Sequence, residues 1–301
     1  MAERPTVLVV GSATRDVDAR DRRGWRLGGA VTYAALAIAR LGLSCRVLIG
    51  VDDEAASAHE LGLLLAAGCE IEYARLAHGP VFDNQEDETG RHQIARAVSD
   101  RIGLRELPPD WRDTPAILMA PVADELGPHW AEAFPATAIV GLGWQGVLRR
   151  LSPGERVKRV RPRSNGLFRR ADLGVVSAED FRHGAGNAAL RRMLPRPGQQ
   201  LLISNGAHPL LHLLRTEGGL RGRILGTDLA THVSDTTGAG DTLMAAWFAG
   251  HVATRAAGVG AHPSRLVRFA IAAATAKVES GGLADMPDLR TLCDRLLRPP
   301  A

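Results

Sequence analysis

Residues 233–242 (VSDTTGAGDT) place a turn of small residues directly before an apolar stretch, residues 243–249. Gly238, Ala239 and Gly240 are too small and flexible for the interior of a strand or helix, so the pattern predicts a tight turn that opens a helix. Such a turn leaves several backbone N–H groups pointing together without partners, and the helix dipole adds positive charge. The segment therefore predicts a site for an anion such as phosphate.

Two aspartates, Asp235 and Asp241, stand on either side of this turn. A carboxylate repels an anion, so Asp241 needs another task, and accepting a proton from an alcohol held next to the phosphorus is the natural one. The combination indicates a phosphotransferase site. The plain alternative is a helix cap, which a single Asp before an apolar stretch would indicate.

The stretch from Asp235 to Asp241 resembles the carboxy-terminal signature DTxGAGD of the ribokinase/PfkB family of carbohydrate kinases. The resemblance implies that Asp241 is the base, that the amides of residues 238–240 form the anion hole, and that Asp235 supports a monovalent cation, with K⁺ as the candidate. It also implies an α/β fold with three layers, in which helices flank a mainly parallel, Rossmann-like sheet and a small β-sheet forms a lid. ATP as co-substrate and Mg²⁺ as cofactor are implied in the same way.

The composition suits one large α/β domain spanning residues 1–301, because 45% of the residues are hydrophobic. No apolar run approaches the ~18 residues of a membrane span, and no signal pattern opens the chain, so we expect a cytoplasmic protein. The only lysines are Lys158 and Lys277, and neither belongs to a GxxxxGK[ST] loop. Phosphate would therefore be handled by backbone amides and arginines. The three cysteines are expected to be buried reduced thiols: Cys45, Cys69 and Cys293.

Residues 6–11 (TVLVVG) predict a buried first strand of a parallel sheet, and Thr14 and Asp16 follow at its carboxyl end. Ligands bind at this edge of such sheets. The pair could serve only as turn formers. The family resemblance implies instead that Asp16 holds substrate hydroxyl groups, with Thr14 beside it.

Gly28 and Gly29 precede a predicted helix over residues 30–41, and together they resemble the amino-terminal family signature GGxxxNxAxxxxRLG. Tyr33 stands where the family most often has Asn. A Tyr cannot supply the paired donor and acceptor of an amide, so recognition of ribose is disfavoured and a cyclitol or modified sugar is favoured. Tyr33 could face the core, but the preceding glycines favour the ligand.

Two segments, approximately 16–27 and 70–98, are predicted to form the lid. The second alternates apolar and polar residues around turns and predicts a hairpin. Asn84 and Arg91 are its candidate substrate contacts, although each could be a solvated strand residue. Lid sheets in the resembled family often pair between subunits, so a homodimer is considered.

Ser177-Ala178-Glu179-Asp180 follows another predicted strand, where the family commonly has Asn-x-x-Glu organising magnesium-bound water. Glu179 and Asp180 are therefore the candidate magnesium residues. The resemblance also implies three nucleotide-binding positions beside the glycine turn: Ser204, Gly206 and Ile271.

Two other kinds of binding site are disfavoured by the sequence. Residues 141–146 (GLGWQG) match GxGxxG, but Pro153, Gly154, Pro162 and Gly166 interrupt the helix that a dinucleotide site requires. The arginine-rich residues 149–170 contain one aromatic residue and favour a solvated hairpin or loop over a nucleic-acid surface.

The sequence thus predicts an ATP- and Mg-dependent kinase of a small polyol, such as a sugar or cyclitol, with no nucleic-acid or membrane partner. Two alternatives stay open: a nucleoside kinase of the same fold, and a non-catalytic regulator that binds a metabolite.

Overall fold

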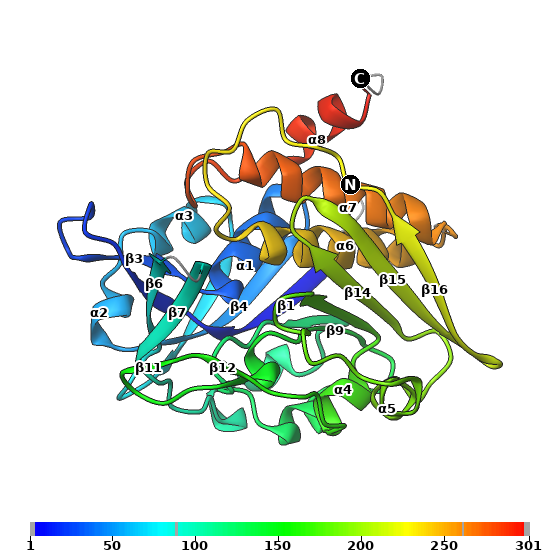
Figure 1. Ribbon diagram of the computed structural model, residues 1–301, viewed down its shortest axis with the longest axis horizontal. Helices are drawn as coiled ribbons and strands as arrows, with labels where there is room; N and C mark the ends of the chain where they lie inside the picture. The colour runs from blue at the N-terminus through cyan, green and yellow to red at the C-terminus, as the bar shows by residue number, and fades with distance from the viewer. Residues whose placement is uncertain (1–3, 88–89, 261, 298–301) are drawn as a thin grey trace.

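The computed structural model describes residues 4–87, 90–260 and 262–297, except for the side chains at positions 86, 87, 90 and 91. Within these residues, a large sheet runs through the molecule in the order β16-β15-β14-β13-β9-β8-β1-β4-β5 (Figure 1). Its strands are β16 (Gly219–Leu225), β15 (His208–Thr216), β14 (Gln200–Asn205), β13 (Leu173–Ser177), β9 (Ile139–Gly143), β8 (Ala116–Met119), β1 (Thr6–Ser12), β4 (Ser44–Val51) and β5 (Glu70–Arg75).

The strands from β14 to β5 are parallel, while β15 and β16 add an antiparallel edge. In β1, the residues after Thr6 are all buried, since helices cover both faces of the sheet. Because the strands are parallel, their carboxyl ends meet at one edge of the sheet. The loops that carry functional residues therefore converge there.

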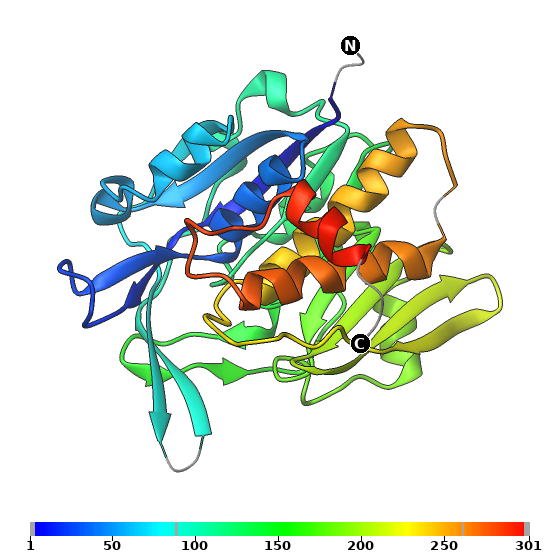
Figure 2. The same cartoon turned by 90° about the horizontal axis from the view of Figure 1, so that it is seen from above.

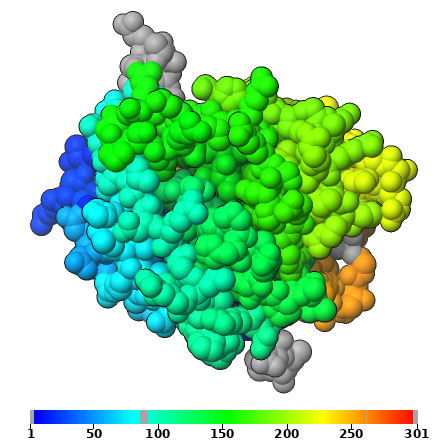
Figure 3. Space-filling view, turned by 90° about the horizontal axis from the view of Figure 1, so that it is seen from below, coloured from blue at the N-terminus to red at the C-terminus, as the bar shows by residue number. Residues whose placement is uncertain are grey.

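Helices cover both faces of the sheet, with α1, α6 and α7 on one side and α4 and α5 on the other (Figure 1). Seen from below, the middle of the chain, coloured cyan to green, covers the second face (Figure 3). The α-helices are α1 (Ala30–Arg40), α2 (Asp53–Ala56), α3 (Leu61–Ala66), α4 (Gly166–Arg170), α5 (Asn187–Met193), α6 (Ala239–Ala256), α7 (Pro263–Val278) and α8 (Leu289–Leu296). No helix in the described ranges is long and apolar enough to cross a bilayer.

Helix α6 is the central element of the first layer and begins directly after Gly238. Its residues 242–249 are all buried, and it packs against both α1 and α7. Trp247 and Phe248 are among the largest fully buried side chains. This burial fixes the amino terminus of α6, and with it the glycine turn, at the edge where the parallel strands end.

A smaller sheet in the order β11-β7-β6-β2-β3 lies beside the large one. Seen from above, the β6–β7 hairpin extends away from the large sheet near the β2–β3 hairpin (Figure 2). Its strands are β11 (Glu155–Arg156), β7 (Gly90–Ala97), β6 (Val81–Asp87), β2 (Thr14–Val17) and β3 (Trp25–Gly28). The fold class predicted from the sequence is confirmed. The expected lid segment 70–98 is corrected at its start, because residues 70–75 form β5 of the large sheet, parallel to β4.

Between α2 and α3, Glu60 accepts hydrogen bonds from the Leu27 N–H (3.2 Å) and from Arg23 (2.6 Å). Strand β9 begins at Ile139, after a turn in which the Ala138 N–H donates to the Pro135 carbonyl. One expectation about the cysteines is corrected. Cys293 is exposed, since α8 lies on the outer surface, whereas Cys45 and Cys69 are buried as expected.

Candidate active site

A cavity of about 310 Å³ lies where the carboxyl ends of the strands, the start of α6 and the small sheet meet. The small sheet contributes Thr14, Asp16 and Asn84, and the glycine turn contributes Gly238, Gly240 and Asp241. Predicted site residues separated by more than 200 positions in the sequence therefore line one space. A cavity of this volume suits a small molecule.

The glycine turn presents unpaired N–H groups at the amino terminus of α6. Gly238 has a φ of 79°, a left-handed conformation that favours glycine. Within the described residues, the N–H groups of Gly238, Gly240 and Asp241 have no acceptor, whereas the Ala239 N–H donates to the Thr236 carbonyl at 3.3 Å. The expected anion hole is thus corrected at one position: the Asp241 amide, and not that of Ala239, is available beside the two glycines.

The Asp241 carboxylate faces the cavity and accepts no hydrogen bond from the described part of the chain. Burial raises its pKa from 3.8 to about 6, and the charges of Asp16 and Asp180 act in the same direction. Arg149 partly opposes them. Asp241 is therefore ionised at neutral pH, yet it is a stronger base than an exposed carboxylate.

Asp16 enters the cavity from β2, and its position depends on Gly28. The Thr14 hydroxyl donates to Asp16 Oδ1 at 2.9 Å. A Cβ at Gly28 would lie 2.3 Å from Asp16 Oδ2, so a larger residue here would displace this carboxylate. Gly29 has a φ of 96°, and a Cβ there would lie 2.7 Å from the Ser12 carbonyl oxygen. The glycine pair thus brings α1 close to the strand ends.

Tyr33 supports the glycine turn from α1. Its side chain is 2% exposed, and a Cβ at Gly238 would lie 2.2 Å from its ring. The aromatic ring therefore packs directly against the turn, and only glycine fits at position 238. Burial raises the pKa of the Tyr33 hydroxyl, so it stays protonated at neutral pH.

Two arginines, Arg149 and Arg159, form one wall of the cavity together with Glu179 and Asp180. Arg149 binds Asp180 through two hydrogen bonds of 2.9 Å, and Ser177 Oγ donates to the same carboxylate at 3.1 Å. Arg159 pairs with Glu179 and approaches Asp180 at 3.4 Å. Such forked guanidinium groups also suit phosphate oxygens.

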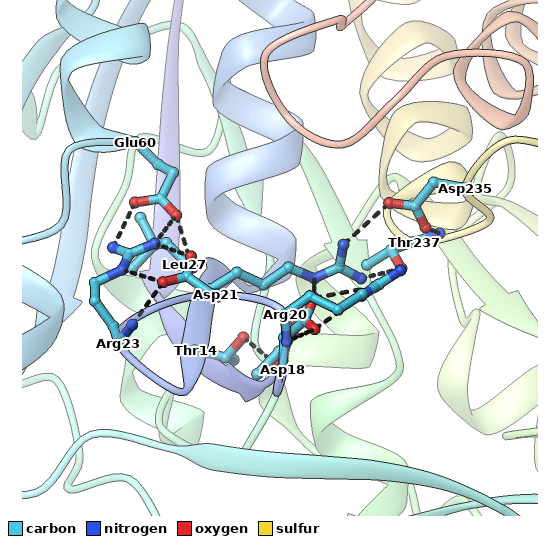
Figure 4. A network of polar contacts seen from close by, with 11 residues as sticks. Thr14, Asp18, Arg20, Asp21, Arg23, Leu27, Glu60, Asp235 and Thr237 are labelled. Atoms are coloured by element: carbon cyan, nitrogen blue, oxygen red, sulfur yellow. Dashed lines mark hydrogen bonds and ion pairs between the residues drawn. The ribbon is translucent and has the colours of Figure 1, made fainter.

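Asp235 lies outside the cavity lining and joins the glycine turn to the small sheet. Its Oδ1 accepts from the Thr237 N–H at 2.8 Å, and its Oδ2 pairs with Arg26 of β3 at 3.3 Å. Arg26 also donates to the Thr237 hydroxyl at 3.1 Å. Figure 4 shows Asp235 and Thr237 facing the residues of the small sheet. Although burial opposes it, the contacts with Thr237 and the charges of Arg26 and Lys277 lower the pKa of Asp235.

Comparison with known proteins agrees with this geometry. Residues 188–289, which include the glycine turn, match the model described as pfkB family carbohydrate kinase. The chain has the ribokinase fold and resembles the PfkB carbohydrate kinases. No curated protein matches the sequence.

Three solved structures illustrate the ribokinase fold. A pyrophosphate-dependent kinase in the ribokinase family, complexed with a pyrophosphate analog and myo-inositol, is 17% identical with a TM-score of 0.73, over 96% of this chain and 99% of that one. A fructokinase from Xylella fastidiosa is 19% identical with a TM-score of 0.73, over 96% and 97%. A ribokinase from Thermotoga maritima is 18% identical with a TM-score of 0.68, over 98% and 100%.

The magnesium residues implied by the PfkB resemblance do not fit a direct metal site in this ribokinase-like chain. Both oxygens of Asp180 accept from Arg149, and Glu179 pairs with Arg159. In the described ranges, no group of three His, Cys, Asp or Glu side chains could hold a metal ion. The positive charge on this wall comes from the two arginines.

The remaining predicted positions in this ribokinase-like chain divide between the cavity and its surroundings. Ser204 lines the cavity at the end of β14, whereas the exposed Gly206 lies beyond the lining. Ile271 is 5% exposed, packs in the core and is not among the residues that line the cavity. Asn84 accepts a hydrogen bond from Gln93 at 2.9 Å. The Arg91 side chain lies outside the described part of the structure.

Sequence reasoning missed Arg149 and Arg159, which it assigned to a solvated hairpin or loop. They lie at the short strands β10 (Arg149–Arg150) and β12 (Lys158–Arg159), which pair next to the cavity. The scarcity of lysine was the available signal, because it left arginine as the side chain that could meet phosphate.

Proposed function

We propose that this protein is a kinase that transfers the γ-phosphoryl group of ATP to a hydroxyl group of a small polyol. The observation that carries the proposal is the Asp241 carboxylate, which accepts no hydrogen bond in the described chain and shares one cavity with the unpaired amides of the glycine turn. A proton acceptor beside an anion-binding turn is what an alcohol-to-phosphate transfer requires.

The acceptor hydroxyl would lie between Asp16 and Asp241. Asp16 accepts hydrogen bonds from the polyol, while Asp241 takes the proton of the reacting hydroxyl group. The resulting oxygen forms a bond to phosphorus as the bond to the leaving ADP breaks. The amides of Gly238, Gly240 and Asp241 stabilise the negative charge on the transferred group.

The donor phosphates would lie toward Arg149 and Arg159, because guanidinium groups bind phosphate oxygens in a fork. Both arginines line the cavity while their carboxylate partners hold them in place. No step of this scheme uses a metal ion held by the protein. We further propose that residues 1–301 form one kinase domain and that the small sheet acts as its lid.

A cyclitol or a sugar is the acceptor class that we favour. The buried Tyr33 occupies the place where an amide would recognise ribose, and the structure complexed with myo-inositol has the same fold. That neighbour is described as pyrophosphate-dependent, so pyrophosphate is a second candidate donor. A nucleoside is the alternative acceptor.

The test is a matrix of sugars, cyclitols and nucleosides against two donors, ATP and pyrophosphate, with direct detection of the phosphorylated product. Phosphorylation of a polyol that is lost in Asp241→Asn supports the proposal. Thermal-shift measurements on the same panel identify bound ligands, because ligands that bind the native state raise its stability. Stabilisation by a polyol without product from either donor would favour the metabolite-binding regulator.

A further inference from the structure

Lys277 is a buried cation with no hydrogen-bonding partner in the described chain. Its side chain is 0% exposed, and its Nζ makes no hydrogen bond. Burying an unpaired ammonium group is costly, so such a residue needs an electrostatic reason to be there. The last turn of α7 provides part of this electrostatic reason, since the carboxyl end of a helix attracts positive charge.

The Lys277 ammonium lies directly behind the glycine turn. Its Nζ is 5.8 Å from the centroid of the Tyr33 ring, and the same ring packs against Gly238. The next residue, Val278, accepts hydrogen bonds through its carbonyl from the N–H groups of Ser234 (2.9 Å) and Asp235 (3.2 Å). The end of α7 is therefore hydrogen-bonded to the segment that leads into the glycine turn.

The surroundings of Asp235 do not fit a dissociable potassium ion. One carboxylate oxygen accepts from Thr237 and the other pairs with Arg26, while the neighbouring Val278 carbonyl already accepts two N–H groups. Potassium needs several oxygen atoms that are free to coordinate it. Lys277 and Arg26 already place two fixed cations near Asp235, and they would repel a third.

We propose that the Lys277 ammonium is a built-in cation behind the anion-binding turn and makes the site independent of potassium. Its charge offsets that of Asp235 and adds to the positive potential that an arriving phosphoryl group meets. Lys277 acts through the turn and does not touch the anion, so it is a positioning residue. Burial lowers its pKa, whereas the carboxylates of Asp235 and Asp285 oppose this shift.

The inference rests on the proposed phosphoryl transfer, but its test measures anion binding without turnover. The affinities of ATP and of inorganic pyrophosphate are measured by calorimetry in KCl, NaCl and choline chloride at equal ionic strength. We expect equal affinities in the three salts. A tenfold or greater gain that is specific to KCl would overturn the inference, whatever the variants show.

Lys277→Met removes the charge but keeps a long side chain, and Lys158→Met is the matched control. Lys158 is the only other lysine, and its side chain is 63% exposed beside Glu155. We expect Lys277→Met to weaken pyrophosphate binding about tenfold or more, while its melting temperature stays equal or rises because a buried unpaired charge is gone. Lys158→Met should change neither quantity.

Unchanged pyrophosphate affinity in a folded Lys277→Met protein would show that Lys277 only fills space. If Met at this position prevents folding, Lys277→Arg is the second variant, and retained affinity in choline chloride is then expected. Failure of both anions to bind in any salt would overturn the proposed function together with this inference. Potassium-dependent binding would overturn this inference alone.

Discussion

Asp241 and Asp180 face the same cavity but have different partners. Asp241 accepts no hydrogen bond in the described chain, and burial raises its pKa to about 6. Asp180 is 4% exposed and is held by Arg149, Ser177 and Arg159. Asp241 is left without a hydrogen bond, while Asp180 fixes two arginines in the wall. The proposed function assigns proton transfer to Asp241 and phosphate binding to the arginines that Asp180 holds.

The largest difference between the two carboxylates should appear in turnover. Asp241→Asn keeps the shape of the side chain but removes the base, so we expect kcat to fall by about 10²- to 10⁴-fold. Steady-state kinetics with the identified acceptor, together with thermal-shift confirmation of ligand binding, measures this effect. Asp180→Asn is the comparison variant and should keep a much larger share of kcat. Equal losses in the two variants would remove the distinction between the walls.

Arg149→Gln should both weaken binding of the phosphate donor and destabilise the fold. The variant leaves Asp180 buried without its main partner, which costs about 3 kcal/mol or more in the free energy of unfolding. Donor KM should rise about tenfold or more. Denaturant unfolding and donor titrations provide the two readouts.

The double variant Arg149→Gln with Asp180→Asn separates these two effects. Replacing the Asp180 carboxylate, which has lost its partner, by a neutral amide should restore most of the stability. The effects of two substitutions on the free energy of unfolding do not add when the residues are in contact. Donor KM should stay high, since the guanidinium group is still missing. Recovery of both properties would show that Arg149 acts only as the partner of Asp180.

Asp16→Asn should act on the acceptor and leave the donor unchanged. The amide keeps the size of the side chain but accepts weaker hydrogen bonds from hydroxyl groups, so we expect acceptor KM to rise about tenfold. Initial-rate measurements at saturating donor provide the test. An effect confined to donor KM would show that Asp16 acts on the donor and not on the acceptor.

The smallest expected effect is that of the Asp241 carboxylate on the free energy of unfolding. The pKa of Asp241 is about 6 in the folded protein and ordinarily 3.8, so its contribution to stability is fully present below pH 3.8 and is lost as pH rises through about 6. Asp241→Asn should therefore be more stable than the wild type at pH 7, by at most about 3 kcal/mol. Urea unfolding at pH 7 and near pH 4 measures this difference, which should shrink at the lower pH. A destabilised variant at pH 7 would contradict the account.

The fold and the place of the glycine turn and Asp241 at the cavity followed from local sequence patterns. Buried apolar runs and glycine pairs indicate parallel strands and the turns after them, and the motif ending at Asp241 combines both signals. The place of Asp16 at the cavity followed because this residue comes directly after the first strand. These features depend on residues that are neighbours in the chain.

The arginine wall could not be predicted in the same way. Arg149 and Asp180 lie 31 positions apart, and their pairing depends on how short strands β10 and β12 fold against the end of β13. The burial of Ile271 likewise depends on the packing of α7 in the core. The position of Lys277 behind the turn requires the contact between α7 and α1 through Tyr33.

The pH dependence of kcat/KM tests the central claim most directly, because it reports the pKa of the essential base in the free enzyme. We predict a fall in kcat/KM below pH of about 6, moved to higher pH in Arg149→Gln and to lower pH in Asp16→Asn, since these charges act on Asp241 in opposite directions. A flat profile from pH 5 to 8, or a limb that neither variant moves, would contradict the assignment of Asp241 as the base.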